Sequence, residues 1–213
     1  MKGLVILLAL SPLVYLAIIW NSLPAQVPIH FNTRFEPDKT GSKDELGCLV
    51  AVLSAVSLII YFLLTNLRRF DPKQRGAAPS SSFTKLALVI SVFITIVNFL
   101  ILIAVKENAA ILRRLLFPLL GLFIAFMGNY MNNIRPNYFA GIRLPWTLSS
   151  DENWKRTHRL AGRLWFIAGL LMAALFLIVP GSVVLFLIIM AVIVMIPVVY
   201  SYWLFKHSAA KKV

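Results

Sequence analysis

The chain has 213 residues, of which 60% are hydrophobic and only 14% are charged, and its mean hydropathy is +0.83. One water-soluble core of this size does not bury so much apolar surface, which excludes an ordinary soluble domain and indicates a membrane protein. The net charge of +13 suggests nucleic acid as a partner, but the basic residues flank apolar blocks, where membrane orientation and anionic lipid account for them. We therefore expect membrane lipid as a partner and no direct nucleic-acid binding.

Six blocks of the chain contain no Asp, Glu, Lys or Arg, and most are long enough to span a bilayer, which takes about 20 apolar residues. In chain order they are 3–20, 46–67, 86–105, 115–134, 164–179 and 183–205. The first block has an alternative interpretation as a cleaved signal peptide, but it is longer than the usual apolar core of such a peptide, and no A-x-A site follows it. The sequence predicts an all-α integral membrane protein, a bundle of about six transmembrane helices.

The distribution of Lys and Arg predicts the orientation of these spans. With the amino terminus inside, fifteen of the 21 basic residues lie on the cytoplasmic side and six lie outside. The positive-inside rule therefore places both termini in the cytoplasm of a multi-pass protein. The charged, Pro- and Gly-containing segment 68–85 indicates a cytoplasmic linker between an amino-terminal two-span unit, 1–67, and a four-span unit, 86–213.

The external loop at 21–45 is the first candidate binding site. Its prolines favour an extended approach followed by a turn. His30, Asn32 and Asp38 are therefore candidates for one small polar site, although a loop tied together by its own hydrogen bonds explains them more simply. Two ligands without a helical or paired-cysteine spacing are poor evidence for a metal, so we predict neither a metal nor a cofactor.

The cytoplasmic segment at 135–163, between the fourth and fifth spans, is the second candidate. Ser149 and Glu152 have the spacing of a capping box, so a helix is expected to begin near Ser150. One face of this helix carries Trp154, His158, Ala161 and Trp165, and another carries Arg156, Arg159 and Arg163. This pattern predicts an interfacial helix that rests on the inner membrane surface and then turns into the fifth span.

A rigid aromatic and basic turn precedes that helix and makes the segment a candidate docking surface for a cytoplasmic partner. The candidate residues are Gly141, Arg143, Pro145, Trp146, Thr147, Trp154, Arg156, His158 and Arg159. Taken singly, the tryptophans are explained as interfacial anchors and the arginines as partners of lipid phosphates.

Two motifs of the chain resemble a known family. Gly141-Ile142-Arg143, Pro145-Trp146-Thr147-Leu148, Trp154 and Thr157-His158-Arg159 closely resemble the signature of the SdpI family of bacterial membrane immunity proteins. Pro28-Ile29-His30-Phe31-Asn32, Pro37-Asp38 and Gly41-Ser42 are similar to the uncharacterised amino-terminal domain that often precedes that signature. The chain departs from these patterns at Phe35, where a glycine is usual, and at Leu144, where a threonine is common.

The resemblance implies a six-span protein of the bacterial cytoplasmic membrane that has no enzymatic activity. It implies protection against a secreted killing peptide, met by the external loop, and capture of a small DNA-binding repressor at the inner surface. With this function we expect no catalytic residues.

A small membrane transporter or channel of unknown substrate is the alternative. The spans contain no ionisable Asp, Glu, Lys or Arg, which counts against ion-coupled transport. Interhelical hydrogen bonds explain the polar residues in or near the spans, Asn98, Asn129, Asn132 and Asn133. A membrane enzyme acting through His30, Asp38, Asp44 and Glu45 lacks a nucleophile paired with a base and a metal-ligand motif.

Overall fold

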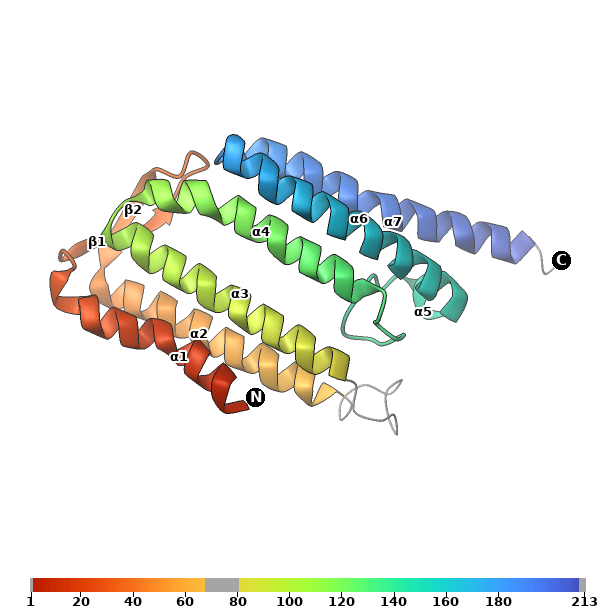
Figure 1. The fold of residues 1–213 in the computed structure, drawn as a ribbon, viewed down its shortest axis with the longest axis horizontal. Helices are drawn as coiled ribbons and strands as arrows, with labels where there is room; N and C mark the ends of the chain where they lie inside the picture. Colours follow the sequence, from red (N-terminus) through yellow and green to blue (C-terminus); the bar gives the residue numbers. More distant parts are fainter. Residues whose placement is uncertain (1, 68–80, 211–213) are drawn as a thin grey trace.

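The computed structural model describes residues 2–67 and 81–210, so most of the predicted linker lies outside the described residues. Six long helices run side by side, each antiparallel to the next (Figure 1): α1 (Lys2–Ile19), α2 (Lys43–Thr65), α3 (Ser81–Lys106), α4 (Ala109–Met131), α6 (Asp151–Ile178) and α7 (Val183–Ala210). All six are long and apolar enough to cross a membrane. The prediction of a six-span, multi-pass membrane protein is confirmed.

The shorter elements define the two ends of the bundle. A 3₁₀ turn, η1 (Trp20–Ser22), and two antiparallel strands, β1 (Gln26–Phe31) and β2 (Pro37–Ser42), form a hairpin at one end. The short helix α5 (Pro145–Leu148) lies at the other end, as do the first residues of α1 and the last residues of α7 (Figure 1). We call these the hairpin end and the α5 end.

The hairpin is the element that the all-α prediction did not include. Its strands pair Val27 with Gly41 and His30 with Lys39, and the register shifts on both sides of His30. An isolated two-stranded hairpin is marginally stable in water, so packing must hold it. Val27 is fully buried among α1, α2 and α3, and β2 runs directly into α2, whose capping box joins Ser42 and Glu45.

The predicted interfacial helix is continuous with the fifth span. It begins where expected, because Ser150 caps it by accepting a hydrogen bond from the Asn153 amide at 3.2 Å. Ser149 instead donates to the Trp146 carbonyl oxygen at 3.3 Å, so the capping box expected between Ser149 and Glu152 does not form. No residue breaks the helix between 151 and 178, and α6 is one rod of 28 residues rather than a surface helix followed by a turn.

Helices α4 and α6 make very close backbone contact. A Cβ atom built on Gly128 would lie 2.3 Å from the Phe166 amide nitrogen, and one built on Gly121 would lie 2.6 Å from that of Ala173. Gly169 faces α4 in the same way, with its Cβ position 2.5 Å from the Ala125 nitrogen. Small residues that let backbones approach are typical of packing between membrane helices, and they join α4 and α6 into one unit.

Two polar side chains inside the bundle form hydrogen bonds between helices. Pro197 has no N–H to donate to the Ile193 carbonyl oxygen one turn earlier, and the indole N–H of Trp165 donates to that oxygen at 2.9 Å. The Asn98 side-chain amide donates to the Val50 carbonyl oxygen at 3.2 Å. The interhelical hydrogen bonding predicted for Asn98 is therefore confirmed.

Candidate functional site

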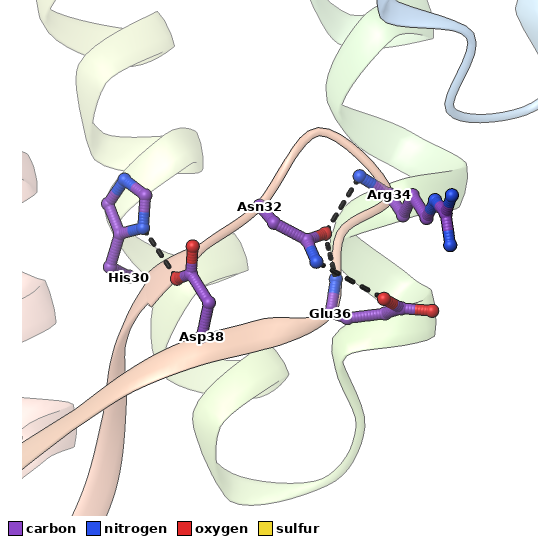
Figure 2. Close-up of polar contacts among 5 residues, drawn as sticks. All are labelled: His30, Asn32, Arg34, Glu36 and Asp38. Carbon is purple, nitrogen blue, oxygen red and sulfur yellow. Dashed lines mark hydrogen bonds and ion pairs between the residues drawn. The ribbon is translucent and has the colours of Figure 1, made fainter.

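The structure brings His30 and Asp38 together on the hairpin. His30 Nδ1 lies 2.6 Å from Asp38 Oδ1, and the two side chains are 65% and 41% exposed (Figure 2). The pair lies on neighbouring strands at the outer surface, where an incoming ligand could reach both. Among the described residues, no three His, Cys, Asp or Glu side chains gather closely enough to hold a metal ion.

Asn32 lies apart from this pair and organises the turn of the hairpin. Its Oδ1 accepts from the backbone amides of Arg34 at 2.8 Å and Glu36 at 3.0 Å, and its side-chain amide donates to the Glu36 carboxylate at 3.1 Å (Figure 2). The hydrogen-bonding groups of an asparagine that caps its own loop in this way are used within the loop itself. Asn32 therefore shapes the hairpin, and His30 and Asp38 are the side chains left open to a ligand.

Phe35 fixes the tip of the hairpin to the bundle. Its φ angle of 62° lies in the left-handed region, which glycine adopts far more readily than other residues. The ring is buried and packs edge-on against Phe117 of α4, with 5.6 Å between the ring centroids. Phe117 in turn contacts Phe176 of α6, with 4.8 Å between their centroids. This burial offsets the backbone strain, and the three rings connect the hairpin tip to α6.

At the α5 end, His158 holds the turn at Gly141. The Ile142 amide donates to His158 Nε2 at 3.0 Å, while His158 Nδ1 lies 2.8 Å from the Trp154 carbonyl oxygen. An amide can only donate and a carbonyl can only accept, so the ring is neutral with its proton on Nδ1. Gly141 has φ +110°, and a Cβ atom there would lie 2.4 Å from His158 Nε2, so this position requires glycine.

Trp154 and Asn137 lie beneath the same turn. Trp154 is fully buried, donates from Nε1 to the Ile134 carbonyl oxygen at 2.9 Å, and stacks on His158. Asn137 is also fully buried, and its side-chain oxygen accepts from the amides of Phe139 and Ala140. Sequence analysis did not include Asn137 among the site residues, although it opens the segment that carries the signature.

A second set of contacts joins this end to α7. Trp146 Nε1 donates to Ser201 Oγ at 3.0 Å, and the Asn153 side chain donates to the Ser201 carbonyl oxygen at 2.9 Å. Thr147 Oγ1 donates to the Ile142 carbonyl oxygen at 2.8 Å. Ser201 was missed because a single serine in an apolar span belongs to no motif.

The predicted docking residues differ in exposure, and Gly141 and Trp146 are half-buried. Thr147, Trp154 and His158 are buried, which corrects the expectation that they face a partner directly. Arg143, Pro145, Arg156 and Arg159 are exposed. Arg143 donates to the Tyr138 carbonyl oxygen at 2.6 Å, and Arg156 pairs with Glu152 at 2.6 Å.

Arg159 belongs to a basic pocket of about 400 Å³ between the end of α4 and the first turns of α6. The lining residues are Asn132, Ile134, Lys155, His158, Arg159 and Arg163. Lys155, Arg159 and Arg163 recur every four residues and therefore share one face of α6. Within the described part of the chain no acidic side chain lines the pocket, so its chemistry suits an anionic group.

Comparison with known proteins relates two regions of the chain to sequence families. Residues 133–201 match the model of the SdpI/YfhL protein family, and residues 7–55 match a domain of unknown function, DUF1648. The chain is 24% identical over 179 residues to Immunity protein SdpI of Bacillus subtilis (strain 168), an alignment that covers 84% of this chain and 83% of that protein. No solved structure matches the chain.

Proposed function

Because this chain belongs to the SdpI/YfhL protein family, we propose that it is an immunity protein of the bacterial cytoplasmic membrane that protects its cell against a secreted killing peptide. The family is one of immunity proteins and not of enzymes. In this proposal the hairpin binds the peptide outside, and the α5 end then holds a repressor protein at the inner surface.

The distribution of charge supports this orientation. The described basic residues at the α5 end are Lys2, Lys85, Arg135, Arg143, Lys155, Arg156, Arg159, Arg163 and Lys206, against the acidic Asp151 and Glu152. At the hairpin end, the basic Arg34, Lys39, Lys43, Lys106, Arg113 and Arg114 are nearly balanced by Glu36, Asp38, Asp44, Glu45 and Glu107. An excess of Lys and Arg marks the cytoplasmic side of a membrane protein.

One observation carries the proposal. Helix α6 is connected to the hairpin tip through aromatic contacts, and the same helix also lines the basic pocket. Phe176, near one end of α6, is linked through Phe117 to Phe35, and Arg159 and Arg163 lie near the other end of the same helix. A ligand that shifts the hairpin can therefore bias the position of α6, which is one unbroken rod. Transmission between two sites requires such an element with two arrangements.

The exposed groups at each end fit these two roles. At the hairpin, the His30 imidazole and the Asp38 carboxylate offer a donor and an acceptor to a peptide. At the α5 end, Lys155, Arg159 and Arg163 have no ion-pair partner within the described part of the chain. They are free to bind acidic side chains of a cytoplasmic protein.

Survival of a sensitive bacterium tests the external part of the proposal. Cells with and without the protein are challenged with membrane-active peptides secreted by its native host or close relatives. We expect protection that is lost in the double variant His30→Ala, Asp38→Ala and retained in Lys39→Ala, which removes an exposed charge from the same hairpin. Absence of protection by correctly inserted wild-type protein refutes immunity, and full protection by the double variant refutes the role of the pair.

Membrane recruitment of a repressor tests the internal part. The double variant Arg159→Gln, Arg163→Gln removes two charges from the pocket, whereas Arg156→Gln removes a charge that lies outside it and is paired with Glu152. We expect the pocket variant to leave the repressor in the soluble fraction after peptide challenge, while the control recruits it normally. Equal recruitment by both variants would exclude the pocket as the docking site.

A further inference from the structure

Helices α3 and α4 meet at the hairpin end and diverge toward the α5 end (Figure 1). Near the hairpin, Leu100 and Ala104 of α3 share a buried cluster with Leu112 and Phe117 of α4. Toward the α5 end this packing gives way to two adjoining pockets between the helices. Together we call them the α3–α4 groove.

The pocket nearer the α5 end is polar and cationic. It has a volume of about 440 Å³ and is lined by Lys85, Leu86, Val89, Phe126, Met127, Asn129, Tyr130 and Asn133. None of the described residues that line it is acidic. Within residues 2–67 and 81–210, Lys85 has no ion-pair partner and the side-chain amides of Asn129 and Asn133 donate no hydrogen bond.

This finding differs from the interhelical hydrogen bonds expected of Asn129 and Asn133. Both are exposed at the end of α4 and line the pocket between the helices. Lys85 lines the same pocket, so its ammonium group and the two side-chain amides are available to one ligand. Three donors without a protein acceptor favour an anionic ligand with several oxygens.

The second pocket is entirely apolar and continues the first. Its volume is about 290 Å³, and it is lined by Leu88, Val89, Val92, Phe93, Ile96, Leu119, Leu122, Phe123 and Phe126. It shares Val89 and Phe126 with the polar pocket, so the two form one groove. Phe93 and Phe123 stack at 4.1 Å between the helices, while Phe126, Leu122 and Ile96 remain exposed to the surroundings of the bundle.

The length of the groove corresponds to one leaflet of a bilayer. From Lys85 to Ile96 the α3 helix rises by roughly 16 Å, at 1.5 Å per residue. Half of a hydrocarbon core is about 15 Å. The groove therefore places a cation at the head-group level and an apolar channel along the acyl region, and it closes where α3 and α4 pack together near the hairpin end.

We propose that the α3–α4 groove binds one phospholipid with an anionic head group, taken from the leaflet at the α5 end. Lys85 pairs with the head-group phosphate, and the amides of Asn129 and Asn133 donate to its oxygens. An acyl chain lies in the apolar pocket against Phe93 and Phe123. This site is independent of peptide immunity, because it uses neither the hairpin nor the basic pocket on α6.

Lipid retention measured by native mass spectrometry tests the head-group contact. The detergent-purified full chain is titrated with phosphatidylglycerol and, separately, with phosphatidylcholine. The wild type should hold one phosphatidylglycerol in preference to phosphatidylcholine, and Lys85→Gln should weaken that binding roughly fivefold, as expected for one cation at a membrane surface. Lys106→Gln, at the opposite end of the same helix, is the matched control and should bind as the wild type does.

A second variant tests the acyl channel. Val92→Phe fills the apolar pocket and should displace both lipids, whereas Leu115→Phe, at an exposed position of α4 outside the groove, should not. Melting temperatures close to that of the wild type establish that the variants are folded. Equal binding of the two lipids, equal loss in Lys85→Gln and Lys106→Gln, or unchanged binding in Val92→Phe would each overturn the proposal.

Discussion

The contact between α4 and α6 gives a prediction whose size follows from the structure. In Gly128→Ala the new methyl group would lie 2.3 Å from the Phe166 nitrogen and 2.8 Å from the Gly162 carbonyl oxygen. Both are backbone atoms of α6 and cannot rotate away. The two helices must therefore move apart, because ordinary contact begins at 3.4 Å.

That separation is about 1.1 Å, taken as the difference between 3.4 Å and 2.3 Å. A radial gap of 0.5–1 Å forfeits about a quarter to a half of each dispersion contact, and overpacking of a buried site costs about 1–3 kcal/mol. Alanine recovers about 1 kcal/mol through its higher helix propensity. Because backbone meets backbone, we take the upper part of the range and expect a net loss of about 2 kcal/mol in the free energy of unfolding.

Equilibrium unfolding in mixed micelles, titrated with a denaturing detergent, measures this loss. Gly47→Ala is the matched control, since its helix gains the same propensity and its nearest neighbour, Trp20 Cζ3, is 3.8 Å away. We expect the control to be neutral or stabilised by up to about 1 kcal/mol. If Gly128→Ala is as stable as Gly47→Ala, the helices α4 and α6 do not pack as closely as the 2.3 Å approach at Gly128 requires.

Two further predictions concern the ends of the bundle. Gly141→Ala places a residue with a side chain at a positive φ angle and directs its Cβ toward His158 Nε2. This should weaken the hydrogen bond from the Ile142 amide to His158 and raise hydrogen exchange at that amide at least tenfold. Unchanged exchange would disprove the contact. Phe35→Ala should cost about 3 kcal/mol in the same micelle titration through loss of a buried ring, and Phe35→Gly about 1 kcal/mol less through relief of the positive φ. Wild-type stability of Phe35→Gly would show that the ring does not anchor the hairpin.

The helices were predictable from sequence because lipid demands long blocks without charge. The strands were not. β2 reads Pro-Asp-Lys-Thr-Gly-Ser, which has no alternating apolar pattern, and it pairs because β1 is buried at Val27 and because Ser42 joins it to α2. Nor could the sequence show that α6 is continuous, since the basic residues at 155–163 are typical of a surface helix as well as of the inner end of a span.

The signature residues could be identified from the sequence pattern, but how deeply each of them is buried could not. Periodicity placed Trp154 and His158 on one face of a helix without showing that the face turns inward, because apolar faces toward lipid and toward protein look alike in a membrane chain. The hydrogen bond from Ile142 to His158 and those to Ser201 join residues far apart in sequence, and no spacing rule predicts them. Charge was more informative, since Arg159 remained at the surface as expected.

The unbroken α6 helix has a mechanical consequence. Because α6 is unbroken and its backbone is packed directly against α4, a rotation imposed at Phe176 would have to carry α4 and α6 together, and Arg159 with them. A 20° rotation moves a side-chain tip that lies about 5–6 Å from the rotation axis by roughly 2 Å. Such a displacement is large enough to break a hydrogen bond, so under the proposed function a movement at the hairpin end would change a charged contact at the α5 end.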